Sequence, residues 1–113
     1  MNIQIFGVSK CFDTKKAQRY FKERGIKFQF VDLTQRNLSK GEYNSVKAAV
    51  GSMEALINEN SKAYEKYFIK YLASKEAVEE KLLEHAELFK TPIVRNGKQA
   101  TVGYCPDVWK TWD

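Results

Sequence analysis

The first third of the chain contains two short apolar stretches separated by one helical pattern. Residues 2–6 alternate polar and apolar side chains up to Gly7, and residues 27–33 place two phenylalanines on one face. Between them, residues 14–24 repeat apolar side chains at helical spacing, and Gly25 is a typical helix terminator. A helix between two neighbouring strands makes those strands parallel, with a right-handed crossover. The start of the chain therefore predicts an α/β fold.

The middle of the chain, at about residues 39–89, is predicted to be a helical insertion. A capping box that begins at Ser39 starts a helix, which Gly51 ends. Residues 61–72 and 74–89 continue the helical spacing, and both are expected to bury their apolar stripes. These stripes are Tyr64, Tyr67, Phe68, Tyr71 and Leu72 in the first helix, and Val78, Leu82, Leu83, Ala86 and Phe89 in the second.

The end of the chain returns to strands. Residues 91–104 are expected to form two strands joined at Asn96-Gly97, a strong signal for a tight hairpin. Cys105 and Pro106 then begin a last short helix. The order β-α-β, helical insertion, β-β-α predicts a thioredoxin-like, four-stranded mixed sheet in a single domain that spans residues 1–113.

Composition limits what such a domain does. The chain of 113 residues has no apolar run long enough for a membrane span and no secretory leader, so a cytoplasmic location is expected. Two cysteines and one histidine are too few for a disulfide framework or a typical zinc site, so no metal and no bound cofactor are expected. The net charge of +5 is spread among glutamates, which makes nucleic acid the least favoured partner.

Cys11 is the first candidate catalytic residue. It would follow the carboxyl end of the first strand and precede the first helix, where ligands gather in open α/β sheets. A helix N-terminus favours an anion such as a thiolate, and nearby cations lower a cysteine pKa further. Lys15 and Lys16 follow in the first turn, and Lys15 is expected to hold the thiolate charge. The alternative is a buried cysteine that acts as a small apolar residue, which the polar neighbours Ser9 and Lys10 disfavour.

Two further residues belong to the same predicted edge of the sheet. Pro92 opens the third strand, where Thr91-Pro92 adopts either an ordinary trans bond or the cis bond that the fold favours. Cys105 follows the fourth strand, two strand spacings from the first, which exceeds the usual reach of a disulfide. Cys105 is therefore expected to be a bystander.

Three segments resemble the arsenate reductase/Spx family, a glutaredoxin-like branch of the thioredoxin superfamily. They are C-x3-K-K-A after the first strand, LINENSKAYEKY in the centre, and KTPIVRNGKQATVGYCPDVWKTW at the end. The resemblance implies that Cys11 is the nucleophile and Pro92 a cis proline. Thr91 stands where the family commonly has an oxyanion-binding arginine, and Arg95 is the one nearby candidate to replace it.

The resemblance implies two functions. The first is a monothiol oxidoreductase that reduces an arsenate-like oxyanion or a disulfide through Cys11, with glutathione or glutaredoxin as co-substrate. The alternative is a regulator of the Spx type that binds RNA polymerase or another protein; Thr14 replaces the second cysteine of the Spx C-x-x-C switch, and Gly51 lies near the expected contact surface. A monomer is expected. The residues expected to bind substrate or glutathione are Ser9, Lys10, Thr14, Thr91, Pro92, Arg95, Gly103 and Tyr104.

Overall fold

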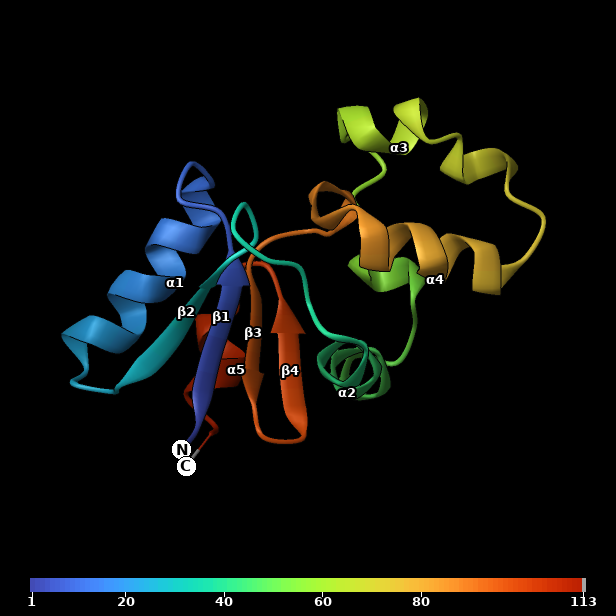
Figure 1. Cartoon of the computed structure of the whole chain (residues 1–113). Coiled ribbons are helices and arrows are strands. Elements are labelled where there is room, and N and C mark those ends of the chain that lie inside the picture. The colour runs from blue at the N-terminus through green and yellow to red at the C-terminus, as the bar shows by residue number, and fades with distance from the viewer. Residues whose placement is uncertain (113) are drawn as a thin grey trace.

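The structure is a computed structural model that describes residues 1–112, and its centre is a four-stranded sheet (Figure 1). The strand order is β2-β1-β3-β4. β1 pairs in parallel with β2 and antiparallel with β3, and β3 pairs antiparallel with β4. The strands are β1 (Ile3–Gly7), β2 (Phe28–Asp32), β3 (Ile93–Asn96) and β4 (Gln99–Val102). The predicted thioredoxin-like mixed sheet is confirmed.

Helices α1 (Phe12–Glu23) and α5 (Pro106–Trp109) cover one face of the sheet. Alternate residues of β1, Ile3 and Ile5, pack there against Phe21 of α1 and Trp109 of α5. Helix α1 begins two residues earlier than the sequence pattern predicts, because Cys11 itself is its N-cap. This earlier start places Cys11 directly at the positive end of the helix.

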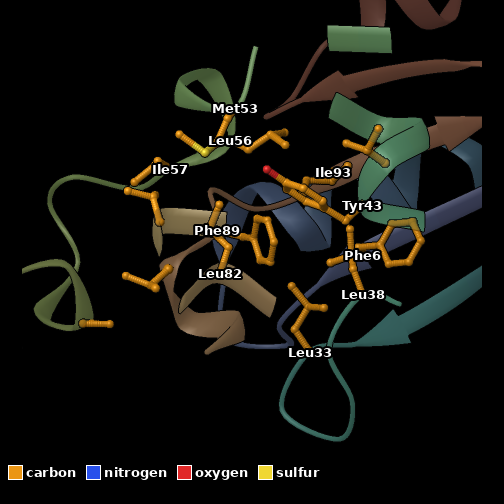
Figure 2. Packing of buried hydrophobic residues seen from close by; sticks show 14 of the residues in the cluster. Phe6, Leu33, Leu38, Tyr43, Met53, Leu56, Ile57, Leu82, Phe89 and Ile93 are labelled. Carbon is orange, nitrogen blue, oxygen red and sulfur yellow. The ribbon is translucent and has the colours of Figure 1, made fainter. Parts of the chain in front are cut away.

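The helical insertion packs against the opposite face. Figure 1 shows its first helix beside β4 and the rest of the insertion further from the strands. Figure 2 shows Phe6 and Ile93 of the sheet in one cluster with Tyr43 and Leu82 of the insertion. None of the helices in residues 1–112 is long and apolar enough to cross a membrane. The elements of the insertion are α2 (Lys40–Val50), η1 (Glu54–Leu56), α3 (Lys62–Lys66), η2 (Ile69–Tyr71), α4 (Lys75–Glu84) and η3 (Ala86–Leu88).

The ends of α2 follow the sequence signals. The Ser39 hydroxyl accepts a hydrogen bond from the Glu42 backbone N–H at 3.1 Å, and the Glu42 carboxylate accepts one from the Ser39 N–H at 2.9 Å. Gly51 ends the helix with a left-handed φ of 103°. The predicted capping box and terminator are both confirmed.

The prediction of one continuous helix over residues 61–72 is wrong. Helix α3 ends at Lys66, and Phe68 has a left-handed φ of 54° that directs the chain into a separate 3-10 turn. Phe68 and Tyr71 are 66% and 77% exposed, whereas Ile69 is buried. The predicted burial of Phe68 and Tyr71 is therefore wrong, because the helix ends at Lys66 and helical spacing no longer decides which side chains face the core.

The predicted helix over residues 74–89 is shorter than expected. Helix α4 ends at Glu84, and an extended His85 leads into η3. Val78, Leu82 and Phe89 are buried as predicted. The break lets the chain turn toward β3, where Ile57 forms an isolated bridge with Phe89.

The β3–β4 hairpin is confirmed, with its loop shifted by one residue. Asn96 pairs with Gln99, so the two loop residues are Gly97 and Lys98 rather than Asn96 and Gly97. Gly97 has a φ of 59°, which a residue without a side chain adopts at low cost. The loop starts at Gly97 because the pairing of β3 with β4 extends through Asn96.

Candidate active site around Cys11

Cys11 is held in place by the backbone at the start of α1. Its N–H donates to the Val8 carbonyl at 3.0 Å, and its own carbonyl accepts from the Lys15 N–H at 3.1 Å. The side chain is partly exposed and makes no capping hydrogen bond as a neutral thiol. The sulfur is therefore fixed at the helix N-terminus and accessible from solvent.

The surroundings lower the pKa of the Cys11 thiol. Burial raises this pKa, but hydrogen bonds from the Thr14 and Thr91 side chains and from the Thr14 and Asp13 backbone outweigh that effect. In the thiol form, Cys11 Sγ donates to the Thr91 carbonyl oxygen at 3.6 Å. A thiolate has no proton to donate, so ionisation replaces that contact with hydrogen bonds from the two hydroxyls. The surroundings therefore favour the thiolate form of Cys11 relative to an unperturbed cysteine.

Thr14 lies beneath the sulfur rather than on the ligand surface. It is fully buried, and its Oγ1 has no hydrogen-bond partner among the described residues. A buried hydroxyl without a partner carries a free-energy penalty that a neighbouring thiolate removes by accepting its hydrogen bond. Sequence reasoning named Thr14 as a ligand contact, whereas the structure makes it a support for the thiolate.

An open pocket of about 580 Å³ surrounds Cys11. Three of the predicted site residues line it: Cys11, Thr91 and Gly103. Sequence reasoning missed the other lining residues, because most of them come from the insertion or its junction with β3. Those residues are Asp13, Ala55, Asn58, Lys90 and Val102.

Two backbone hydrogen bonds bring the insertion to this pocket. The Asn58 N–H donates to Leu88 O at 2.8 Å, and the Lys90 N–H donates to Leu56 O at 2.8 Å. These bonds hold residues 56–58 beside the segment that precedes β3. Asn58 and Lys90 thereby line the same pocket as Cys11, although they are far apart in sequence.

The Thr91-Pro92 peptide bond is cis. Of the two alternatives, this is the one expected for a thioredoxin-like fold. The Pro92 carbonyl accepts a hydrogen bond from the Gly103 N–H at 2.8 Å, which fixes Gly103 at the pocket. Pro92 itself is buried. The Thr91 N–H has no hydrogen-bond partner within residues 1–112. An extended ligand in the pocket has this N–H available for pairing.

The structure does not bring Arg95 to Cys11. Its guanidinium donates to the Gln4 side chain at 3.0 Å and to the Gly97 carbonyl at 3.2 Å. Because β3 runs antiparallel to β1, each residue after Ile93 lies further from the carboxyl end of β1. Arg95 therefore does not take the place of an arginine at Thr91.

Four other predicted residues lie around the pocket without lining it. Ser9 and Lys10 are exposed in the loop before Cys11, and Lys15 is exposed on α1. Hydrogen bonds, rather than a lysine, lower the Cys11 pKa. Tyr104 follows Gly103 and packs under the Lys16 ammonium, whose Nζ lies 4.8 Å from the ring centroid.

Cys105 is a free thiol, as is Cys11. Its Sγ donates to the Val102 carbonyl at 3.3 Å, and burial raises the pKa of its thiol. The pKa values of the two thiols are thus shifted in opposite directions, lowered for Cys11 and raised for Cys105. Within residues 1–112 no group of three or more metal-binding side chains comes together.

Comparison with known proteins places this geometry in a family. The model of the ArsC family matches residues 6–112. A curated relative, the global transcriptional regulator Spx 2 of Oceanobacillus iheyensis, is 30% identical over 112 residues, which cover 95% of this chain and 80% of the relative.

Solved structures show the same fold. Arsenate reductase from Vibrio cholerae superposes with a TM-score of 0.85 at 22% identity, covering 96% of this chain and 94% of that one. An ArsC-family-related protein from Bacteroides fragilis gives a TM-score of 0.84 at 18% identity, with both chains fully covered. The glutaredoxin-like NrdH-redoxin of Escherichia coli gives 0.50 at 14% identity, covering 100% of this chain and 96% of that one. The chain is a member of the ArsC family and has a thioredoxin-like fold.

Proposed function

We propose that the protein is a thiol-dependent oxidoreductase with Cys11 as its nucleophile. The observation that carries this proposal is the position of Cys11 as N-cap of α1, where hydrogen bonds lower its pKa. A thiolate, and not a thiol, attacks disulfides. Family membership and the arsenate reductase fold support the same chemistry.

The proposed reaction uses one cysteine of the protein. The Cys11 thiolate attacks one sulfur of a substrate disulfide, forms a mixed disulfide and releases the other sulfur as a thiolate. Glutathione thiolate then attacks the mixed disulfide, which yields a glutathionylated product and regenerates the Cys11 thiolate. Cys105 has a raised pKa and bonds to Val102, so an external thiol is the better resolving agent.

The charges of the pocket suit glutathione. Lys90 supplies a cation and Asp13 a carboxylate on the lining of one pocket. Glutathione carries two carboxylates and one ammonium group. Lys90 can therefore pair with a carboxylate, and Asp13 can pair with the ammonium group. The Thr91 N–H adds a donor for its peptide backbone.

The same pocket suits a tetrahedral oxyanion less well. Thr91 offers one hydroxyl where an arginine would offer two parallel hydrogen bonds and a charge. Asp13 adds a carboxylate to the lining of the pocket. We therefore propose a disulfide as the preferred substrate over arsenate.

A thiol-transfer assay with a glutathione mixed disulfide tests this function. Cys11→Ser is expected to abolish turnover, whereas Cys105→Ser is expected to retain it. Mass spectrometry should detect one glutathione on Cys11 when turnover is stopped early. Full activity of Cys11→Ser would refute the mechanism, and faster turnover of arsenate than of the disulfide would refute the substrate preference.

A second candidate function is a regulatory one. The identity to Spx 2 favours it, together with Gly51, which is exposed at the end of α2 in open space. In this proposal the end of α2 contacts RNA polymerase or another protein partner. Gly51→Arg is expected to abolish binding to purified RNA polymerase. Gly25→Arg is the matched control, since Gly25 also has a positive φ and open surroundings.

A further inference from the structure

A second hollow lies on the face of the sheet covered by α1 and α5. It has a volume of about 400 Å³, and we call it the α1–α5 groove. Its lining consists of four cations, one carboxylate, two tyrosines and one proline. The charged residues are Lys16, Arg19, Arg24, Lys110 and Glu23, and the tyrosines are Tyr20 and Tyr104. The redox mechanism uses none of these charges.

Two of the cations are held in place by aromatic rings. The Arg24 guanidinium carbon lies 3.7 Å from the Tyr20 ring centroid, and its Nη1 donates to the Tyr20 carbonyl at 3.2 Å. The Lys16 ammonium lies between two rings, 4.8 Å from the centroid of Tyr104 and 5.2 Å from that of Phe12. Because these side chains are already ordered, an anion that binds them loses less conformational entropy.

Positive charge in the groove exceeds the negative charge available to it. Within residues 1–112, Lys16, Arg19 and Arg24 form no ion pair with a carboxylate. Lys110 pairs with Asp107 at 3.5 Å, but both side chains are well exposed, so this pair contributes little. An anionic partner therefore gains charge-assisted hydrogen bonds without displacing a strong internal ion pair.

The arrangement of the Tyr20 and Tyr104 rings favours an acidic peptide over a nucleic acid as the ligand of the groove. Single-stranded nucleic acids bind through stacking of bases on aromatic faces. Tyr20 is only 5% exposed, and Tyr104 is covered by Lys16 and meets the Trp109 ring edge to face at 5.5 Å. Tyr20 offers no free face to a base, and the Lys16 ammonium covers one face of Tyr104, which is 39% exposed. The groove thus lacks a row of open rings for base stacking, whereas the arginine side chains suit carboxylates.

We propose that the α1–α5 groove binds an acidic segment of a protein partner. The groove adjoins the Cys11 pocket, because Gly103 lines the pocket and the next residue, Tyr104, lines the groove. A partner bound there lies beside the reactive thiol. The binding requires charge alone, so it holds whether or not Cys11 turns over a disulfide.

The test is fluorescence anisotropy with the full chain and labelled hexaglutamate at low ionic strength. Arg19→Gln/Arg24→Gln is expected to weaken binding about tenfold, as the loss of two charge-assisted contacts predicts. Lys62→Gln/Lys75→Gln removes the same charge from the exposed surface of the insertion and is expected to leave affinity within about twofold. Glu23→Gln is expected to tighten binding.

Circular dichroism checks that each variant folds. If the loss of Arg24 unfolds the chain, Arg19→Gln/Lys110→Gln replaces the first variant, since both of these side chains are exposed. Equal weakening by the groove and insertion variants would overturn the proposal, because the charge would then act diffusely. So would the absence of saturable binding, or tighter binding of oligo(dT) that the groove variant removes.

Discussion

Thr14 occupies the space that a side chain on Gly7 would need. A Cβ built on Gly7 would lie 2.5 Å from Thr14 Oγ1 and 2.6 Å from Thr14 Cγ2. The last residue of β1 is thus a glycine because the first turn of α1 packs directly against it. This contact sets how closely the helix N-terminus, and with it Cys11, approaches the end of the strand.

Gly7→Ala is expected to raise the pKa of Cys11 and to destabilise the protein by about 1–3 kcal/mol, as overpacking of a tight site does. The new methyl group must push Thr14 away and so removes its hydrogen bond to the thiolate. Thiolate absorbance against pH and urea unfolding measure the two effects. Gly41→Ala is the matched control, because nothing lies within 4 Å of its Cβ position.

Thr14→Val removes the hydroxyl group and keeps the volume of the side chain. The pKa of Cys11 is expected to rise, because the thiolate loses a hydrogen-bond donor while the thiol loses none. Stability at acidic pH is expected to stay the same or increase, since a buried hydroxyl without a partner is removed.

Lys15→Gln is the companion variant and is expected to leave the Cys11 pKa nearly unchanged, since Lys15 is exposed. Both titrations are made in a Cys105→Ser background so that only one thiol absorbs. A large rise in pKa on loss of Lys15 would show that the lysine charge, and not the hydroxyl, supports the thiolate.

Glu42 is expected to make the protein sensitive to acid. The bidentate hydrogen bonds from Arg36, together with the Ser39 N–H, lower the pKa of Glu42 to about 2 from its ordinary value of 4.5. A lowered folded-state pKa gives stability that is present above pH 4.5 and is lost as the pH falls toward 2. Because Arg36 is 46% exposed, solvent screening limits this contribution to about 1 kcal/mol.

Glu42→Gln is therefore expected to be less stable than the parent at neutral pH and nearly equal to it at the acid end of this range. Thermal unfolding followed by circular dichroism across that range measures the difference. A constant difference at every pH would contradict the assigned ion pair.

Thr101→Val is expected to destabilise the α5 side of the core by about 1–3 kcal/mol. The Trp109 Nε1 donates to Thr101 Oγ1 at 2.8 Å, and both residues are buried. Valine keeps the volume but leaves the indole N–H without an acceptor. Thr111→Val, at an exposed threonine, is the control in denaturant unfolding, and an equal effect of both variants would contradict this role.

Local sequence signals predicted the order of elements and the position of Cys11 at the start of the first helix. Strand alternation, the Ser39 capping box and the glycines at positions 25, 51 and 97 act over a few residues, so the chain displays them directly. The position of Cys11 at a helix N-terminus was predicted from the same local information, because Cys11 lies in a polar turn between a strand and a helix. The parallel pairing of β1 and β2 also follows, because one helix separates the two strands.

Tertiary packing decided the rest of the site. Asn58 and Lys90 reach the Cys11 pocket through backbone hydrogen bonds between residues thirty or more positions apart, which no local pattern encodes. Packing also exposed Phe68 and turned Arg95 toward Gln4, because the burial of each side chain depends on the layer opposite it. The sequence by itself determined the order of the elements and the place of Cys11 at a strand-to-helix turn. The tertiary structure decided that Thr91, Asn58 and Lys90 join Cys11 at one pocket, because this depends on contacts between distant segments.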